Sequence, residues 1–336
     1  MNVFGLTRAL VDIESITENE SQVGSFLHDH LSKLAARTGG RVERMAVEGD
    51  RFNVLACWGN PLVTLSTHMD TVPPFFASSE DAEFIRGRGS CDAKGIIASM
   101  TAAAEKLLGE GVTNFALLFV VGEERNSAGA AVAALAARGS RYLVNGEPTE
   151  NKLALASKGV LRIEVVARGR MAHSAYPELG ESAIEKLLDA LDAIRRVPLP
   201  EDALMGRCTM NIGTIAGGRA PNVIPDLAKA EIMVRLVGDP SVVREAFAGA
   251  AAGRVELNEV LCLPAMRFVN VDGLPTTVVS FATDVPIFGR SWGEPLLLGP
   301  GSIHVAHTSE ERIAKKDLAD AVEIYATVMK KLLAAA

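Results

Sequence analysis

The stretch PLVTLSTHMDTVPPF, residues 61–75, contains the pattern from which the fold can be worked out. Its apolar run is typical of a buried strand, and the strand ends in His68 and Asp70 before two prolines stop it. Such an ending has two interpretations. The two side chains form either a hydrogen-bonded structural pair, or a metal ligand with the carboxylate that orients it.

Two further apolar runs end in acids in the same way. FALLFVVGEE, residues 115–124, ends in Glu123 and Glu124, and RYLVNGEP, residues 141–148, contains Glu147. A continuous apolar run is typical of a strand that is buried on both faces. Small-residue helices are expected between these strands, and residues 51–59 form a further strand. The alternation predicts an α/β domain: a mostly parallel sheet with helices on both faces.

The pattern changes after residue 157. A strand, a helix, two strands, a helix and a strand follow, which is the ferredoxin-like α+β order. We therefore expect a catalytic domain of residues 1–157 and 264–336, and an inserted lid or dimerisation domain of residues 158–263. Two domains suit a chain of 336 residues.

Composition limits the function classes. The formal net charge is −7 and no basic run occurs, which argues against a nucleic-acid partner. No two of the four cysteines form a Cys-x-x-Cys pair, so a thiolate zinc site is not expected and the thiols should be reduced. No secretory h-region is complete at the N-terminus and no apolar run is long enough for a membrane span. We expect a cytoplasmic protein without a membrane partner.

The acids and histidines should converge, because ligand crevices in open α/β sheets lie beyond the carboxyl ends of the strands. Asp92, in a glycine-rich loop, and His307, near the C-terminus, can join His68, Glu124 and Glu147. Taken singly, an acid at a strand end usually caps a helix or faces water, and His68 could be a hydrogen-bonded structural histidine. The joint pattern favours a metal site.

Histidine and carboxylate ligands without thiolates suit zinc, cobalt or manganese. Five ligands exceed the needs of one tetrahedral ion, so the set predicts two ions that share a bridging carboxylate. A water bound there needs a general base. The extra glutamate beside a ligand glutamate, in the pair Glu123–Glu124, is the candidate.

These motifs, taken in order over nearly the whole chain, resemble the metallopeptidase family of acetylornithine deacetylase, succinyl-diaminopimelate desuccinylase and the glutamate-releasing carboxypeptidases. The matching stretches are H-x-D at 68–70, D-x-K-G at 92–95, G-E-E at 122–124, G-E-P at 146–148, A-H-S at 172–174, N-V-I-P at 222–225, G-P-G at 299–301, and A-H-T at 306–308 followed by Glu311. One departure is Ile96, where relatives often have a second glycine after the lysine of D-x-K-G.

The resemblance implies a role for each site residue. His68 and Glu147 would hold one metal ion, Glu124 and His307 the other, and Asp92 would bridge the two ions. Asp70 would accept a hydrogen bond from the second ring nitrogen of His68, and Glu123 would be the base. The peptide bond after Asp92 is expected to be cis. His304 is the alternative to His307 as a ligand.

The resemblance also implies roles in the lid. His173 would stabilise the oxyanion, often from the partner subunit of a homodimer. Arg235 and Asn222 would hold the substrate carboxylate or the tetrahedral intermediate, and the main chain near Gly301 would help to bind that carboxylate. The structural alternatives are a turn residue for His173 and a surface ion pair for Arg235.

The implied activity is hydrolysis of an N-acyl amino acid by two divalent ions, most simply zinc, with cobalt or manganese as alternatives. Acetylornithine, acetylcitrulline and acetyl-lysine of arginine or lysine biosynthesis are the first candidate substrates. Succinyl-diaminopimelate and small peptides, cleaved as by a carboxypeptidase or dipeptidase, follow. An aminopeptidase and a non-catalytic binding relative are the remaining alternatives. The first would need acids that bind a free amine, and the second should have lost a ligand or the base.

Overall fold

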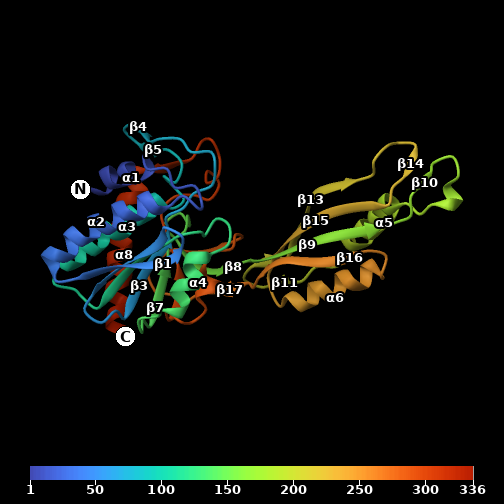
Figure 1. The fold of residues 1–336 in the computed structure, drawn as a ribbon. Coiled ribbons are helices and arrows are strands. Elements are labelled where there is room, and N and C mark those ends of the chain that lie inside the picture. The colour runs from blue at the N-terminus through green and yellow to red at the C-terminus, as the bar shows by residue number, and fades with distance from the viewer. Residues whose placement is uncertain (336) are drawn as a thin grey trace. The chain divides into compact units, whose positions relative to one another are not determined.

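The computed structural model describes residues 1–335, which divide into two compact units (Figure 1). Within the described residues, the first unit comprises residues 1–155, 268–277 and 283–335, and the second comprises residues 156–267 and 278–282. The second unit thus begins two residues before the predicted insertion and extends past its predicted end at residue 263.

The first unit is built on a sheet with the strand order β1-β2-β6-β3-β7-β19-β8-β17, with β18 paired to β8. The four strands β6, β3, β7 and β19 are parallel, as predicted, whereas the strands on both sides of them pair antiparallel. The bounds are β1 Arg41–Glu48, β2 Arg51–Trp58, β3 Val63–His68, β6 Phe115–Val120, β7 Tyr142–Asn145, β8 Leu153–Ser157, β17 Met266–Arg267, β18 Thr276–Val279 and β19 Glu294–Leu297.

Helices cover both faces of this sheet. The odd-numbered side chains of β6 pack with α1, α2, α3 and α8 in one core, and the even-numbered ones pack with α4 and α7 in another. This alternation explains why the strand is apolar throughout. The helices are α1 Val3–Val11, α2 Ser21–Thr38, α3 Lys94–Gly109, α4 Ala128–Leu135, α7 Val285–Phe288 and α8 Lys315–Ala335; a small sheet adds β4 Ser79–Glu80, β5 Phe84–Arg86 and β20 Arg312–Ala314.

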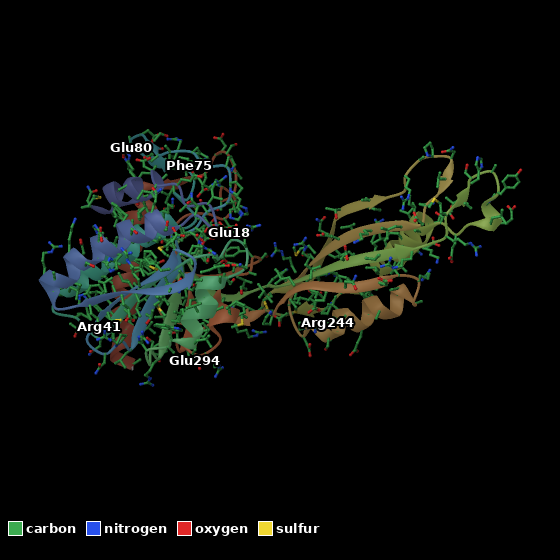
Figure 2. The ribbon with its side chains drawn as sticks, in the orientation of Figure 1. Glu18, Arg41, Phe75, Glu80, Arg244 and Glu294 are labelled. Atoms are coloured by element: carbon green, nitrogen blue, oxygen red, sulfur yellow. The ribbon has the colours of Figure 1, made fainter. Side chains whose placement is uncertain are left out.

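The second unit is the predicted ferredoxin-like domain. Its four-stranded antiparallel sheet has the order β13-β15-β9-β16, and α5 and α6 pack on one face of it. Arg244 of α6 pairs with Glu259 of β16 at 2.6 Å on the surface of this unit (Figure 2). The bounds are β9 Gly159–Arg168, β10 Ala172–His173, a 3-10 turn Pro177–Leu179, α5 Ala183–Arg195, β11 Glu201–Asp202, β12 Gly206–Arg207, β13 Thr209–Gly217, β14 Val223–Ile224, β15 Leu227–Leu236, α6 Pro240–Ala251 and β16 Glu256–Leu263.

Local sequence accounts for several element boundaries. Ser182 accepts a hydrogen bond from the backbone N–H of Glu185 at 3.2 Å and begins α5. Asp239 caps α6, with Pro240 at the first helical position, where its missing N–H costs nothing. Gly39 ends α2 with φ 75°, a left-handed conformation that glycine adopts without strain.

Candidate metal centre

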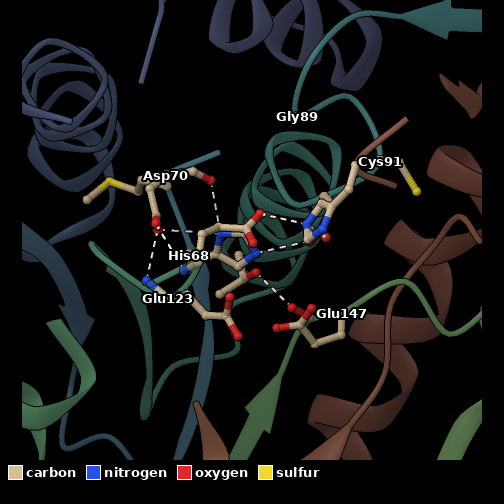
Figure 3. A network of polar contacts seen from close by, with 12 residues as sticks. His68, Asp70, Gly89, Cys91, Glu123 and Glu147 are labelled. Carbon is tan, nitrogen blue, oxygen red and sulfur yellow. Dashed lines mark hydrogen bonds and ion pairs between the residues drawn. The ribbon is translucent and has the colours of Figure 1, made fainter. Parts of the chain in front are cut away.

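Three parallel strands place their carboxyl ends at one edge of the sheet. His68 is the last residue of β3 and lies opposite Val120, the last residue of β6. Glu123 and Glu124 follow β6, and Glu147 follows β7, whose Asn145 pairs with Ser66 of β3. Figure 3 shows Glu123 and Glu147 on the same side of the His68 ring. The strand register therefore explains why residues far apart in sequence meet here.

Asp92 faces both histidines. Its Oδ1 lies 3.0 Å from His68 Nε2, and its Oδ2 lies 3.3 Å from His307 Nε2. His307 Nε2 also lies 3.0 Å from Glu124 Oε1. One ligand atom from each of His68, Asp92 and Glu124 falls within 4.8 Å of the others. The carboxylate of Asp92 therefore presents one oxygen to each imidazole, as a bridging ligand requires.

The structure distinguishes His307 from its alternative. Both side chains are exposed, but His307 contacts two acids of the cluster, Asp92 and Glu124, whereas His304 forms no ion pair with either acid within residues 1–335. His307 has φ 62°, a left-handed conformation that is uncommon outside glycine and turns its side chain toward Asp92. The Asp92–Ala93 peptide bond is cis.

The cluster holds more negative charge than its histidines can offset. Burial raises the pKa of Glu123 well above its usual value, and the charge of Glu147 adds to the effect. Burial likewise raises the pKa of Glu147. Hydrogen bonds to Asp92 and Glu124 raise the pKa of His307 to about 10. Buried carboxyls that repel one another need cations nearby. Their oxygens, with two imidazole nitrogens and no thiolate, fit divalent metal ions.

Asp70 contacts more than the histidine it was expected to orient. His68 Nδ1 lies 3.0 Å from the backbone O of Asp70 and 3.6 Å from its Oδ1. The same carboxylate accepts hydrogen bonds from the backbone N–H groups of Glu123 and Glu124, each at 3.1 Å, and from Thr17 Oγ1 at 2.8 Å. Asp70 thus holds the His68 ring through its backbone oxygen, instead of the carboxylate that was expected, and its carboxylate holds the turn that carries the candidate base (Figure 3).

The remaining predicted residues lie elsewhere. Gly301, in the first unit, has φ 82°, and a Cβ there would come within 2.5 Å of Cys91 Sγ. In the second unit, His173 Nδ1 accepts the N–H of Ala175 at 3.1 Å, and the carbonyl of Asn222 accepts the N–H of Ser174 at 3.1 Å. Arg235 of β15 is partly buried, and burial lowers its pKa. Within residues 1–335 its guanidinium forms no ion pair or hydrogen bond.

Sequence reasoning missed one acid of the site. Asp284, at the start of α7, is 2% exposed, and neither of its Oδ atoms has a hydrogen-bond partner within the described chain. Burial raises its pKa to about 7, with the charge of His68 acting against the shift and the charges of Asp70 and Glu124 adding to it. The stretch ATDVP, residues 282–286, does not follow an apolar strand directly, so its acid gave no signal.

Comparison with known proteins places this fold and site in a family. Residues 64–331 match the profile of Peptidase family M20/M25/M40. A Peptidase M20 domain-containing protein of Schizosaccharomyces pombe is 36% identical over 336 residues, which cover 96% of this chain and 83% of that protein. A probable carboxypeptidase of Aspergillus flavus is 37% identical over 377 residues, covering 98% and 86%.

A solved structure has the same fold. The M20 family metallo-carboxypeptidase Sso-CP2 of Sulfolobus solfataricus superposes with a TM-score of 0.77 at 16% identity, over 97% of this chain and 98% of that one. The fold and the site define a hydrolase of the metallopeptidase class. The chain belongs to Peptidase family M20/M25/M40.

Two further expectations concern the chain as a whole. All four cysteines are free thiols, and three of them are buried. Within residues 1–335, no helix is both long enough and apolar enough to cross a membrane.

Proposed function

We propose that this protein is a metal-dependent amide hydrolase for small substrates that carry a free carboxylate, with two ions held by His68, Glu147, Glu124, His307 and a bridging Asp92. The observation that carries the proposal is the placement of Asp92, which turns one oxygen to each histidine. When bound, divalent zinc, cobalt or manganese would polarise the scissile carbonyl and lower the pKa of the attacking water.

Glu123 is the proposed general base. It adjoins the candidate ligand Glu124, and its backbone N–H donates to Asp70 at 3.1 Å, which fixes the turn. In the metal-free protein, burial and the charge of Glu147 raise its pKa well above the usual value. Two cations beside it would oppose this shift and favour the carboxylate form that a base requires. Glu123 accepts the proton of the attacking water and then delivers it to the departing amine nitrogen.

Arg235 of the lid is the proposed site for the substrate carboxylate, together with Asn222 and the main chain near Gly301. A partly buried guanidinium without an acidic partner among the described residues supports this role, because burial of an unpaired charge is costly. Arginine also suits carboxylates, since its donors can bind both oxygens at once. An amine-binding aminopeptidase site would place acids here instead.

The names of two relatives support the proposed choice of substrate. The probable carboxypeptidase of Aspergillus flavus and the metallo-carboxypeptidase of Sulfolobus solfataricus favour small peptides with a free C-terminus. N-acetyl amino acids such as acetylornithine, acetylcitrulline and acetyl-lysine form the second candidate class. Both classes present the same group, an amide next to a carboxylate. The motif resemblance supports the second class, and the comparisons lend it no separate support.

The experiment is hydrolysis of a substrate panel by chelator-stripped protein, with and without added zinc or cobalt. The panel contains dipeptides, N-acetyl amino acids, succinyl-diaminopimelate, and the same dipeptides with an amidated C-terminus. We expect metal-dependent cleavage of the dipeptides and none of their amides. The Glu123→Gln variant should bind metal as the wild type does and lack turnover. Cleavage of the amidated peptides at an equal rate would exclude Arg235 as a carboxylate site.

A homodimer through the lid is part of the proposal, with His173 stabilising the oxyanion from the partner subunit. The two roles can be separated by mixing two inactive variants, His173→Ala and Glu123→Gln. A mixed dimer would contain one site with both residues intact, so activity should return on mixing. If His173 acts within its own subunit, mixing will restore nothing.

A further inference from the structure

Glu311 is a buried carboxylate that lies outside the candidate ligand set. It is 1% exposed and lies four residues after His307, directly before β20. Its Oε1 accepts the backbone N–H of Gly89 at 2.9 Å, of Cys91 at 3.2 Å and of Asp92 at 3.1 Å. One oxygen atom thus accepts hydrogen bonds from three backbone amides of the loop that ends in Asp92.

Its other oxygen is also occupied. Oε2 accepts a hydrogen bond from Arg88 Nη1 at 2.5 Å, and Arg88 is 1% exposed. Arg88 Nε donates to the carbonyl of Pro74 at 3.2 Å, and its guanidinium lies 5.0 Å from the centre of the Phe76 ring. Arg88 therefore ties Glu311 to the segment that follows β3. Both carboxylate oxygens are in use, so Glu311 has none left for a metal ion.

The arrangement joins two parts of the cluster. Glu311 belongs to the segment that carries His307, and its three amide partners belong to the segment that carries Asp92. A displacement of either segment would change the distance between His307 Nε2 and Asp92 Oδ2, now 3.3 Å. Asp70 contacts the other side of the site in the same manner, through the amides of Glu123 and Glu124. Such outer contacts typically change metal affinity about 10–100-fold when removed.

We propose that Glu311 is a positioning residue of the metal centre: by holding the amides of the 89–92 loop it places Asp92 against His307 and so sets the affinity for metal. The inference rests on the proposed metal site. It assigns the function to the amide contacts, and it assigns to Arg88 only the neutralisation of a buried charge.

Two double variants separate these two roles. Glu311→Gln with Arg88→Met keeps an oxygen for the three amides and removes both charges together. Glu311→Leu with Arg88→Met has similar side-chain volumes but leaves the three amides without an acceptor. Apo protein is titrated with cobalt(II), and its visible absorption reports the coordination geometry. We expect the variant with Glu311→Gln and Arg88→Met (the Gln variant) to have a cobalt affinity within about threefold of the wild type. The variant with Glu311→Leu and Arg88→Met (the Leu variant) should bind cobalt about 10–100-fold more weakly and have an altered spectrum.

A matched control removes a buried hydrogen bond at the opposite end of β3. Thr64 Oγ1 and Ser140 Oγ lie 2.6 Å apart, both buried. Thr64→Val should lower the melting temperature and leave cobalt affinity and spectrum unchanged. If the Leu variant does not fold, Glu311→Asp serves in its place. It keeps the charge but is one methylene too short for all its contacts, so cobalt binding should weaken and the spectrum should change.

The outcomes are distinct. Wild-type affinity and spectrum in the Leu variant, or in Glu311→Asp, would overturn the positioning role. If the Gln variant binds cobalt as weakly as the Leu variant does, the ion pair and not the amide contacts sets the metal affinity. If the wild type itself binds no cobalt, the proposed metal centre fails, and that failure is distinguishable from a failure of the positioning role of Glu311.

Discussion

Two acids of the site accept hydrogen bonds from backbone amides. Asp70 accepts the N–H groups of Glu123 and Glu124, and Glu311 accepts that of Asp92. A carboxylate that accepts several N–H groups is held in one orientation and holds the chain in return. At the scale of single residues, the site therefore combines side chains aimed at the metal position with side chains that fix the turns beneath them.

Replacement of His307 by Ala should lower the number of metal ions bound, because its Nε2 lies 3.3 Å from Asp92 Oδ2 and 3.0 Å from Glu124 Oε1. His304→Ala is the matched control, since His304 is the alternative ligand, is equally exposed and lies three residues away. Metal content after dialysis, measured by atomic emission, checks both variants. If His307→Ala keeps all its metal and His304→Ala loses some, His304 and not His307 is the metal ligand.

Asp284 makes the stability of the metal-free protein depend on pH. Burial raises the pKa of its carboxyl to about 7, so the folded protein holds a proton there that the unfolded chain releases near pH 4. This contribution to stability is complete below pH 4 and is lost as the pH rises through about 7. The Asp284→Asn substitution removes this pH-dependent contribution. The melting temperature of the variant should therefore fall less between pH 5 and pH 8 than that of the wild type.

Thermal unfolding in the presence of a chelator measures this difference. Chelator keeps metal ions from binding the neighbouring acids, which would otherwise dominate the result. Equal pH dependence in the variant and the wild type would show that Asp284 is not protonated in the folded protein near neutral pH.

The sequence predicted the residues at strand ends and missed those that depend on tertiary contacts. His68, Glu124 and Glu147 could be found because each follows an apolar run. Glu311 was recognised only as a motif position, and its amide contacts come from a loop more than 200 residues earlier in the chain. Asp284 follows no buried strand, so only its burial reveals it.

At the scale of elements, the edge strand β1 and the antiparallel pairing of the outer strands were the main omissions. Residues 41–48, which form β1, are mostly exposed or partly exposed and carry charges, so they lack the apolar run that identified β2 and β6. The parallel centre could be predicted because it is buried on both faces. Since the candidate ligands follow central strands, the site could be placed without the outer ones.

The contact between α4 and the end of β6 is tight enough to test. A Cβ at Gly129 would come within 2.4 Å of the carbonyl oxygen of Val121 and 2.5 Å of Asn53 Oδ1. Asn53 joins the same two segments, since its Oδ1 accepts the N–H of Val121 at 3.1 Å and its Nδ2 donates to the carbonyl of Gly129 at 2.8 Å. Gly129→Ala should therefore destabilise the protein by about 1–3 kcal/mol.

A matched substitution in another helix controls for the change of residue type. Gly109 ends α3, and a Cβ there would meet nothing within 4 Å. Gly109→Ala should be neutral or stabilise by up to about 1 kcal/mol, because alanine favours helix. Urea unfolding of both variants gives the comparison. A loss in Gly109→Ala as large as that in Gly129→Ala would show that the spacing around Gly129 has no special effect.

At the scale of the whole molecule, the two units have separate cores. The first unit packs around its central sheet, and the second unit has its own core, in which Phe247 of α6 is fully buried. All five candidate ligands belong to the first unit. The proposed metals should therefore stabilise one unit and leave the other unchanged, because a ligand stabilises only the structure that binds it.

Calorimetric unfolding with and without chelator tests this separation. Metal at about 100 times its dissociation constant adds about 2.7 kcal/mol per site, so chelator should lower the melting temperature of the first unit alone. Phe247→Leu opens space in the lid core and should move only the other transition, which assigns the two. His307→Ala should reduce the effect of chelator. If chelator shifted both transitions equally, the two units would unfold as one, and metal binding would stabilise the lid as well as the site.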